Sequence, residues 1–258
     1  MLTHLFRLAL RPIYPIYEKY LSREVRSGPI PNHIAVILDG NRRYAMKRGF
    51  SEVTIGHEIG AEKVKEFLQW CLDLGIKQIT LFAFSTENFR RPKREVERLM
   101  DLIEKKLYEF AEDEEIHQKK VRIRVIGRRN LLPERVIRAI EKAEKVTENY
   151  DSYLLNVALA YGGRAELIDA LRSIMKDVKN GVLTSRDITE KLIDQRLYTR
   201  DGEPPEVIIR TSGERRLSNF LLWQSTNTYL SFVDVYWPEV RRIDLLRGIR
   251  LFQKRCMS

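Results

Sequence analysis

Short apolar runs alternate with longer amphipathic stretches from Gly28 onward, and this alternation constrains the fold more than any other feature. The apolar runs are typical of strands, and the stretches between them are typical of helices. Strands joined by helices build parallel sheets, so the sequence predicts an α/β fold: a single domain with a central, mostly parallel β-sheet flanked by helices. The predicted strands are 34–38, 79–84, 121–127, 154–161, 207–210 and 229–235.

The helices are predicted from apolar residues that recur at helical spacing. One lies between the first two strands and ends near Gly75, and the others are 94–117, 133–148 and 164–178. No repeat, low-complexity tract or linker divides the chain after residue 28. We therefore expect an N-terminal amphipathic segment, 1–28, followed by one folded domain, 29–258.

Two interpretations of segment 1–28 remain open, because its apolar residues are interleaved with arginine and lysine. A basic amphipathic helix can lie on an anionic membrane surface. Alternatively, the segment forms a helix that packs on the body or on a partner and is broken near Pro12 and Pro15.

The chain carries 46 Lys and Arg against 36 Asp and Glu, a net charge of +10. This excess favours anionic partners, but no nucleic-acid-binding motif accompanies it, so we expect no nucleic acid partner. The two cysteines and four histidines lack metal-ligand spacing and suggest neither zinc nor disulfides. No apolar run reaches the roughly 18 residues of a membrane span. The expected location is cytoplasmic, with peripheral membrane contact as an option.

A polar segment directly follows the first predicted strand. Asp39 comes directly after the strand, Gly40 permits a tight turn, and Asn41, Arg42 and Arg43 come next. A carboxylate can hold Mg²⁺ that bridges diphosphate oxygens, while guanidinium groups neutralise the remaining charge. An ordinary strand-to-helix turn capped by Asp39 is the alternative. The spacing alone leaves both open.

Polar residues also follow two later strands. Segment 83–99 supplies a hydroxyl, an amide and arginines before a helix-opening proline, a pattern that ordinary loop polarity would also explain. Segment 207–223 places hydroxyls and further arginines after Arg210, which resembles an anion cradle. Because ligands collect at the carboxyl ends of parallel strands, we expect these segments to meet.

Together these segments resemble a known enzyme family. In chain order they read HIAVILDGNRRYA, FAFSTENFRRP, RIRVIG, NVALAYGGRAEL and IIRTSGERRLSNFLLWQ. They are similar to the ordered signature segments of cis-prenyltransferases, the undecaprenyl diphosphate synthase family, across residues 30–242. The resemblance implies a hydrophobic tunnel, Mg²⁺ as cofactor and usually a homodimer. It also implies condensation of isopentenyl diphosphate with an allylic diphosphate, farnesyl or geranylgeranyl, into a Z-polyprenyl diphosphate that serves as a glycosyl-carrier lipid precursor.

The resemblance assigns roles to individual residues. Asp39 and Asn88 are the implied catalytic residues, and Asp39 is also the implied Mg²⁺ residue. Arg210, Arg216 and Ser218 would hold isopentenyl diphosphate, and Ala83 would lie where product length is controlled. The implied substrate-binding set is Gly40, Asn41, Arg42, Arg43, Tyr44, His57, Ser85, Glu87, Phe89, Arg91, Arg210, Arg216 and Ser218.

Some positions depart from the family pattern. Tyr229 stands where a glutamate usually helps to hold Mg²⁺ across the dimer interface, and Tyr44 and Phe89 stand where tryptophans are frequent. The alternative function is therefore a non-catalytic subunit of a heteromeric cis-prenyltransferase. Tyr229 favours this alternative, whereas the presence of Asp39 and Arg43 speaks against it.

Overall fold

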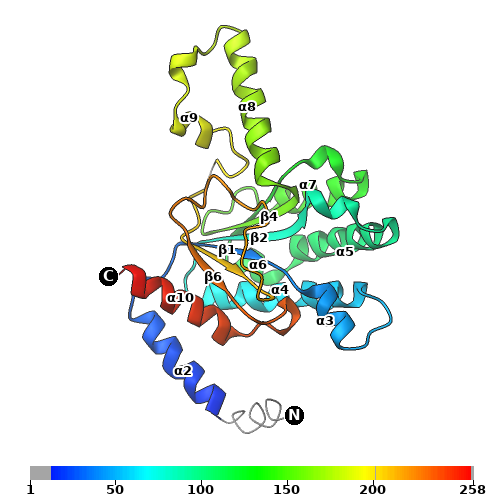
Figure 1. The fold of residues 1–258 in the computed structure, drawn as a ribbon, viewed down its shortest axis with the longest axis vertical. Coiled ribbons are helices and arrows are strands. Elements are labelled where there is room, and N and C mark those ends of the chain that lie inside the picture. Colours follow the sequence, from blue (N-terminus) through cyan, green and yellow to red (C-terminus); the bar gives the residue numbers. More distant parts are fainter. Residues whose placement is uncertain (1–12, 201, 257–258) are drawn as a thin grey trace.

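A single parallel sheet forms the centre of the computed structural model, which describes residues 13–200 and 202–256 (Figure 1). Within those residues the sheet has six strands in the order β3-β4-β2-β1-β5-β6, and every neighbouring pair is parallel. The predicted α/β class is confirmed. The strands are β1 (His33–Ile37), β2 (Gln78–Ser85), β3 (Val121–Ile126), β4 (Tyr153–Tyr161), β5 (Val207–Arg210) and β6 (Tyr229–Phe232).

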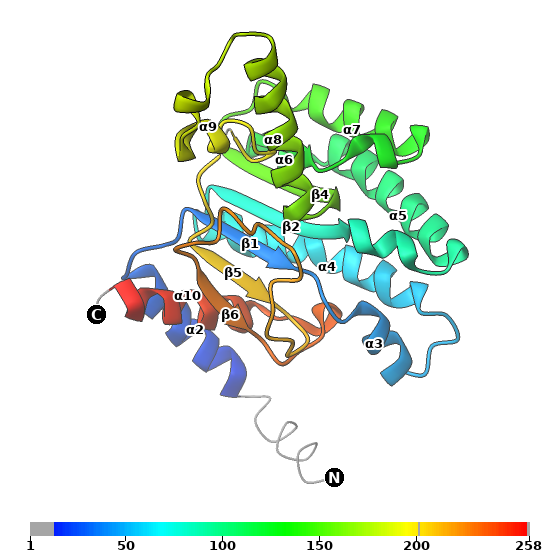
Figure 2. The ribbon, with the colours of Figure 1, turned by 45° about the horizontal axis from the view of Figure 1, so that its top comes forward.

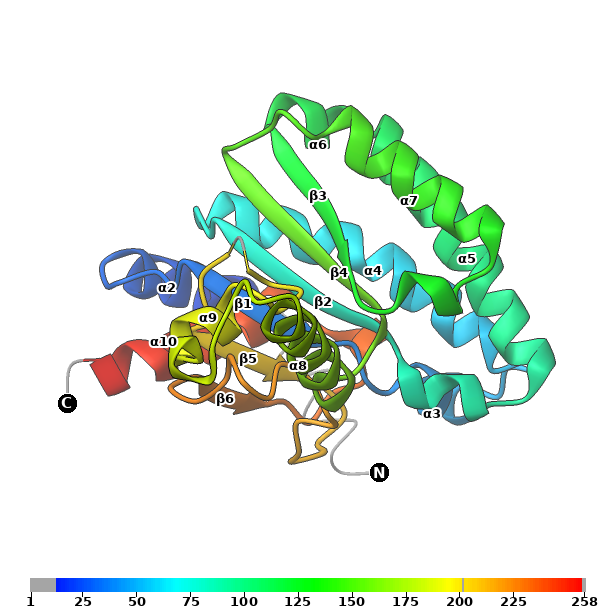
Figure 3. The ribbon, with the colours of Figure 1, turned by 90° about the horizontal axis from the view of Figure 1, so that it is seen from above.

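Helices cover both faces of this sheet, with α4, α5 and α7 on one side and the arm of α8 and α9 on the other (Figure 3). Alternate residues of β1 serve the two sides: Val36 belongs to a large core, and Ile37 belongs to a smaller core with Phe220. The helices are α2 (Ile13–Arg26), α3 (Asn41–Lys47), α4 (Thr54–Asp73), α5 (Lys93–Glu112), α6 (Glu114–Gln118), α7 (Glu134–Val146), α8 (Gly163–Lys179), α9 (Glu190–Asp194) and α10 (Arg242–Cys256).

Two predicted elements were too long. The helix expected over 94–117 is two helices, because the Asp113 side chain accepts hydrogen bonds from the backbone N–H groups of Glu115 and Ile116 and so starts α6. The strand expected over 229–235 ends at Phe232. Ser212 and Gly213, both at positive φ, interrupt the regular strand pairing after Arg210, although their N–H groups still donate to the carbonyls of Val235 and Val233.

The N-terminal helix α2 packs on α10. Leu21 and Val25 are fully buried, and Gln253 Nε2 on α10 donates to the Val25 carbonyl at 2.7 Å. Pro15 does not break α2, because it lies in the first turn, where its missing N–H has no helical partner to lose. Pro12 lies outside the described residues. The structure thus shows α2 packing on the body and leaves its outer face exposed. None of the described helices is both long and apolar enough to span a bilayer.

The strands β2, β1 and β5 are parallel neighbours, so their carboxyl ends lie side by side at the same end of the sheet (Figure 2). The chain places β2 on one side of β1 and, much later, β5 on the other side. Such a switch in strand order leaves a crevice at the carboxyl ends, where open parallel sheets bind ligands. Asp39 follows β1, Ser85 ends β2 and Arg210 ends β5, so the topology brings together the polar segments expected to meet.

Candidate active site

Asp39 and Arg210 form the centre of the site, although they are 171 residues apart in the chain. Arg210 Nη2 donates to Asp39 Oδ2 at 2.7 Å, and Arg210 Nη1 donates to Ser218 Oγ at 2.7 Å and to the Arg216 carbonyl. The Arg210 side chain is only 3% exposed. A buried guanidinium needs such partners, because an unpaired charge in this position would be costly. The arrangement fixes Arg210 and orients the carboxylate.

Arg43 binds the other oxygen of the same carboxylate. Its Nη2 lies 3.3 Å from Asp39 Oδ1 and donates to Ser212 Oγ at 2.6 Å, while Nη1 contacts Glu214 at 3.2 Å. The turn between Asp39 and Arg43 needs a glycine at position 40, because its φ is +105° and an added Cβ would lie 2.7 Å from the Tyr236 ring. The turn after β1 is therefore built around a glycine.

The Asp39 carboxyl stays ionised despite its partial burial. Burial by itself raises its pKa, but the hydrogen bond and charge of Arg210, the contact with Ser212 and the charge of Arg43 outweigh burial. The net effect holds the pKa of Asp39 below its ordinary value. An ionised carboxylate flanked by two guanidiniums can take part in both cation and diphosphate binding.

His57, on α4, contacts a carboxylate that the sequence did not single out. Glu95 is buried at the start of α5, and its Oε1 lies 3.4 Å from His57 Nε2, 3.1 Å from Arg91 Nη1 and 3.5 Å from Arg42 Nε. Burial lowers the pKa of His57 to about 4, helped by the nearby arginine charges and opposed by Glu95. His57 is therefore a neutral imidazole near pH 7. Glu95 fixes the positions of three expected binding residues.

These side chains surround a polar cavity of about 600 Å³. Ten of the expected site residues line it: Asp39, Asn41, His57, Ser85, Glu87, Asn88, Arg91, Arg210, Arg216 and Ser218. Gly40, Arg42 and Arg43 do not line it, but Arg43 contacts the lining residue Asp39 and Arg42 contacts Glu95. Arg164 and Asn219 also line it, without having been proposed as binding residues, although Arg164 lies in the segment NVALAYGGRAEL, directly after a strand.

Three expected residues have other contacts. Tyr44 lies 6.2 Å from the Phe50 ring, and Phe89 packs edge-on against Phe84 at 4.9 Å, and neither side chain lines the polar cavity. Asn88 lines the cavity, but its Oδ1 also accepts a 2.9 Å hydrogen bond from Ser85 N and closes the turn after β2. These local contacts do not test a role in catalysis or binding.

The segment after β5 is held in an uncommon backbone conformation. Ser212, Ser218, Asn219 and Leu221 all have positive φ, between 44° and 77°. Each such residue costs about 1–3 kcal/mol, and such residues cluster where function requires a fixed geometry. Asn219 is held on both sides, since its Oδ1 accepts from Arg164 N and its Nδ2 donates to Glu87, each at 2.9 Å. The surrounding contacts thus determine the shape of this loop.

An apolar cavity of about 110 Å³ continues from the polar one between α4, α5 and the sheet. The two share Leu38, Asn41, His57, Ala83 and Leu99, so they form one passage. Ala83 is exposed in the middle of β2, between buried neighbours, because its small side chain faces this passage. A polar pocket that opens into an apolar channel suits an amphiphile with a charged head and a hydrocarbon tail.

Comparison with known proteins decides the family. A family model described as putative undecaprenyl diphosphate synthase matches residues 37–257. The chain belongs to this family. A tritrans,polycis-undecaprenyl-diphosphate synthase (geranylgeranyl-diphosphate specific) from Methanopyrus kandleri is 53% identical over 255 residues, which cover 99% of this chain and 94% of the relative.

Solved structures agree with this membership in the undecaprenyl diphosphate synthase family. Lavandulyl diphosphate synthase from Lavandula x intermedia, in complex with dimethylallyl diphosphate, has a TM-score of 0.82 and 35% identity, covering 89% of this chain and 96% of that one. A probable undecaprenyl diphosphate synthase from Campylobacter jejuni has a TM-score of 0.71 and 29% identity, covering 88% and 97%. The predicted family and enzyme class, a prenyltransferase, are confirmed.

The arrangement of acidic groups in this prenyltransferase suits a metal ion whose ligands come mainly from the substrate. Among the described residues, no three His, Cys, Asp or Glu side chains gather into a ready-made metal cluster. Mg²⁺ commonly binds one or two carboxylates plus substrate phosphates and water. Asp39 suits this mode, because it is ionised and each arginine uses only one of the two lone pairs on a carboxylate oxygen.

Tyr229 lies near the amino ends of the strands, whereas Asp39 of the same chain lies at their carboxyl ends. It pairs with Val207 at the start of β5, whereas Asp39 contacts Arg210 at the end of β5. Tyr229 is partly buried and packs on the large core. Any effect of this residue on the Asp39 site of this prenyltransferase would have to come from another subunit or act indirectly.

Proposed function

We propose that this cis-prenyltransferase condenses isopentenyl diphosphate with geranylgeranyl diphosphate into a Z-polyprenyl diphosphate, a precursor of a glycosyl-carrier lipid. The observation that carries the proposal is the Asp39 carboxylate between Arg43 and Arg210, which lines a polar cavity that continues into an apolar channel. Geranylgeranyl diphosphate is favoured over farnesyl diphosphate because the Methanopyrus relative is named as specific for it.

The two diphosphates are placed on either side of the Asp39 carboxylate. Arg43, Asn41 and the turn at Gly40 bind the allylic diphosphate, whereas Arg210, Arg216 and Ser218 bind isopentenyl diphosphate. Mg²⁺ held by Asp39 would neutralise charge on the allylic diphosphate as its bond to carbon breaks. The arginines stabilise the same developing negative charge, and preorganised charges of this kind are usually the largest contribution to catalysis.

His57 and Asn88 act as neutral hydrogen-bonding groups in this scheme. His57 is uncharged because of its lowered pKa, so it can contact the leaving diphosphate only through a ring N–H. Asn88 projects from the turn after β2 into the cavity between the two diphosphate sites. The allylic tail enters the apolar channel beside Ala83, which keeps the reacting carbons near the polar cavity.

Incubation of the purified protein with Mg²⁺ and labelled isopentenyl diphosphate tests the proposal directly. Parallel reactions contain geranyl, farnesyl or geranylgeranyl diphosphate, and the products are sized by chromatography. We expect polyprenyl diphosphates, most rapidly from geranylgeranyl diphosphate, and no product after chelation of the metal. Products only a few units long would contradict the carrier-lipid role. If the chain by itself makes no product but raises the activity of an active homologue, the result would instead support the alternative of a non-catalytic subunit.

The proposed partner is a second copy of the chain, docked on the outer face of α8. This helix projects from the body (Figure 1) and exposes Ile168, Leu171 and Met175 at spacings of three and four residues. Such spacing places them on one face, and an exposed apolar face of this kind marks an interaction site.

Light scattering tests the dimer. We expect the wild type to have the mass of two chains and Leu171→Glu to shift the distribution to monomers, because a carboxylate would have to be buried in the interface. Val146→Glu, at an exposed apolar position on α7, is the matched control and should stay dimeric. A monomeric wild type would contradict this interface.

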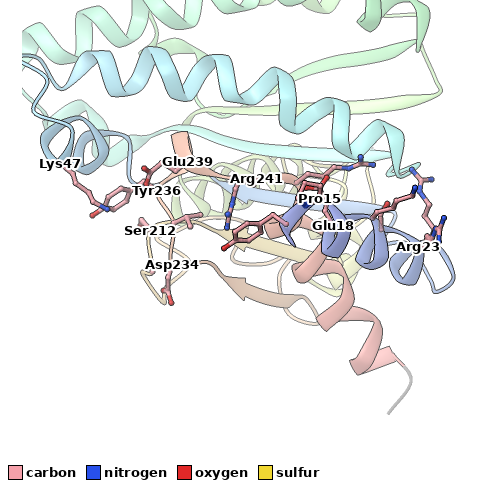
Figure 4. Close-up of a pocket in the computed structure, with 16 residues that line it drawn as sticks. Pro15, Glu18, Arg23, Lys47, Ser212, Asp234, Tyr236, Glu239 and Arg241 are labelled. Atoms are coloured by element: carbon pink, nitrogen blue, oxygen red, sulfur yellow. The ribbon is translucent and has the colours of Figure 1, made fainter. Parts of the chain in front are cut away.

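The outer surface of α2 is the proposed place of peripheral membrane contact. Ile16 and Tyr20 are exposed beside Lys19 and Arg23. A hollow of about 1050 Å³, rich in basic side chains, lies between α2 and the segment that joins β6 to α10 (Figure 4). Exposed apolar groups next to basic groups suit an anionic bilayer.

Flotation with phosphatidylglycerol vesicles tests this contact. Wild-type protein should float at low salt, and Ile16→Glu/Tyr20→Glu should bind several-fold less, because both substitutions place carboxylates at the bilayer surface. Leu131→Glu, at an exposed apolar site after β3, is the control. Equal flotation of all three proteins would remove α2 from the proposed contact.

A further inference from the structure

A separate hollow of about 980 Å³, here called the amino-end hollow, lies at the amino ends of β2, β3 and β4, at the opposite end of the sheet from Asp39. None of its lining residues lines the polar cavity or the apolar channel. A volume of this size is typical of small-molecule sites. The excess of basic over acidic side chains in the lining favours an anion: Lys77, Arg122, Arg124 and Arg200 against Asp151 and Glu203.

Gln78, the first residue of β2, presents an unused hydrogen-bond donor in this hollow. Its side chain is only 5% exposed, and its Oε1 accepts from Glu203 N at 3.1 Å. A backbone N–H can only donate, so this contact identifies the amide oxygen and leaves Nε2 as the donor. Nε2 is buried and has no hydrogen-bond partner among the described residues. A buried donor without an acceptor is costly, so the position suits an acceptor that a ligand brings.

The backbone of Glu203 is held on both sides and therefore fixes the Gln78 amide. Its carbonyl accepts from Nδ1 of the buried His33 at 2.6 Å. Asn156 Nδ2 donates to Thr80 Oγ1 at 3.0 Å, which directs the hydroxyl proton of Thr80 to His33 Nε2 at 2.8 Å. Burial lowers the pKa of His33 to about 4, in agreement with a neutral ring that accepts at Nε2. The orientation of the Gln78 donor is thus determined by buried neighbours.

Two exposed cations lie beside this donor. Arg122 on β3 and Gln78 on β2 are both in register with Leu154 on β4, so their Cα atoms are two strand spacings apart, about 10 Å. Residues in register on parallel strands point to the same face, so both side chains lie on one face of the sheet. Lys77 precedes Gln78, and its Nζ lies 4.5 Å from the centre of the Tyr153 ring. One amide donor and two cations suit the oxygens of phosphate groups.

We propose that the amino-end hollow binds a diphosphate group, with Gln78 Nε2 as the buried neutral donor and with Arg122 and Lys77 as the cations. Two linked phosphates fit better than one, because the donors come from β2 and β3 on either side of β4. The ligand is the free diphosphate ion or a small organic molecule that carries a diphosphate. This site is separate from the Asp39 cavity, and the proposal does not depend on the function proposed above.

Equilibrium dialysis with labelled inorganic diphosphate tests the site. Gln78→Glu keeps an oxygen acceptor for Glu203 N and replaces the donor with a carboxylate, and Arg122→Gln removes one cation. We expect each variant to bind one equivalent of diphosphate at least about 10-fold more weakly than the wild type, the effect of losing a charge-assisted hydrogen bond. The same equivalent should persist in Arg210→Ala, which alters only the Asp39 cavity. Gln195→Glu is the matched control, because Gln195 is exposed at the end of α9 and lies outside the hollow.

Unchanged binding in Gln78→Glu and Arg122→Gln, or an equal loss in Gln195→Glu, would overturn the proposal. Arg122 is exposed, so Arg122→Gln keeps the test decisive should Gln78→Glu fold poorly. Diphosphate that is lost only in Arg210→Ala would assign all binding to the Asp39 cavity and would also overturn it. Competition by ADP identifies the source of the diphosphate: displacement supports an organic diphosphate at this site, and its absence supports the free ion.

Discussion

Asp39→Asn is expected to lower kcat by about 10²- to 10³-fold, the usual loss when one preorganised charge is removed from a reacting centre. Asparagine keeps the shape of the side chain and one oxygen acceptor, so Arg210 retains a hydrogen-bond partner. Alanine is a poorer choice, because it would leave the buried guanidinium of Arg210 without its carboxylate. The measurement is single-turnover and steady-state product formation at saturating substrates.

The control for this experiment is Asp234→Asn. Asp234 is exposed and lines the basic hollow beside α2 rather than the polar cavity. Its kcat should match the wild type, and both variants should keep the wild-type circular dichroism and melting temperature within a few degrees. Near-wild-type turnover by Asp39→Asn would remove Asp39 from the chemistry and with it the proposed metal position.

Arg210→Ala is expected to raise the KM for isopentenyl diphosphate by about 10- to 100-fold, because a charge-assisted hydrogen bond contributes about 1.5–3 kcal/mol. It should also lower kcat, since Arg210 orients Asp39 directly. The pKa of Asp39 should rise without this arginine, so the acid limb of the kcat profile should move to higher pH. Initial rates at varied isopentenyl diphosphate and pH measure all three effects.

Two neighbouring arginines provide the comparison for Arg210. Arg216 lines the cavity but is 62% exposed, so Arg216→Ala should raise the same KM less than Arg210→Ala. Arg215 does not line the cavity, and Arg215→Ala should leave both constants unchanged. A KM for isopentenyl diphosphate that does not change in Arg210→Ala would contradict the assignment of this diphosphate to Arg210.

Much of the fold could be predicted because its strands are short, apolar and separated by amphipathic helices. The predicted strand 207–210 agrees with β5 at both ends, and the strand predicted over 34–38 differs from β1 by one residue at each end. The last strand was overestimated because apolar alternation continues through Val235, while the positive φ of Ser212 and Gly213 interrupts the regular pairing with the segment after β5. Hydrophobic periodicity indicates which face of a strand is buried, but it does not indicate where pairing with the neighbouring strand ends.

The sequence was enough to predict that the site lies at the carboxyl ends of the strands. Strand ends carrying Asp39 and Arg210 were expected to meet, and the structure places their side chains 2.7 Å apart. The role of Glu95 could not be inferred, because its contacts with His57 and Arg42 depend on how α3, α4 and α5 pack. A buried glutamate in an amphipathic helix looks like any other charged helical residue in the sequence.

The wide separation of Asp39 and its partners along the chain has a consequence for synthesis. All five residues of β1 are buried, and β5 pairs with the edge of β1 that β2 leaves open. During synthesis Asp39 is made 171 residues before Arg210. Its carbonyl also accepts a hydrogen bond from Trp237 N, which is made still later. A nascent chain therefore carries an apolar strand with one open edge through most of translation, which is the period when such edges invite aggregation.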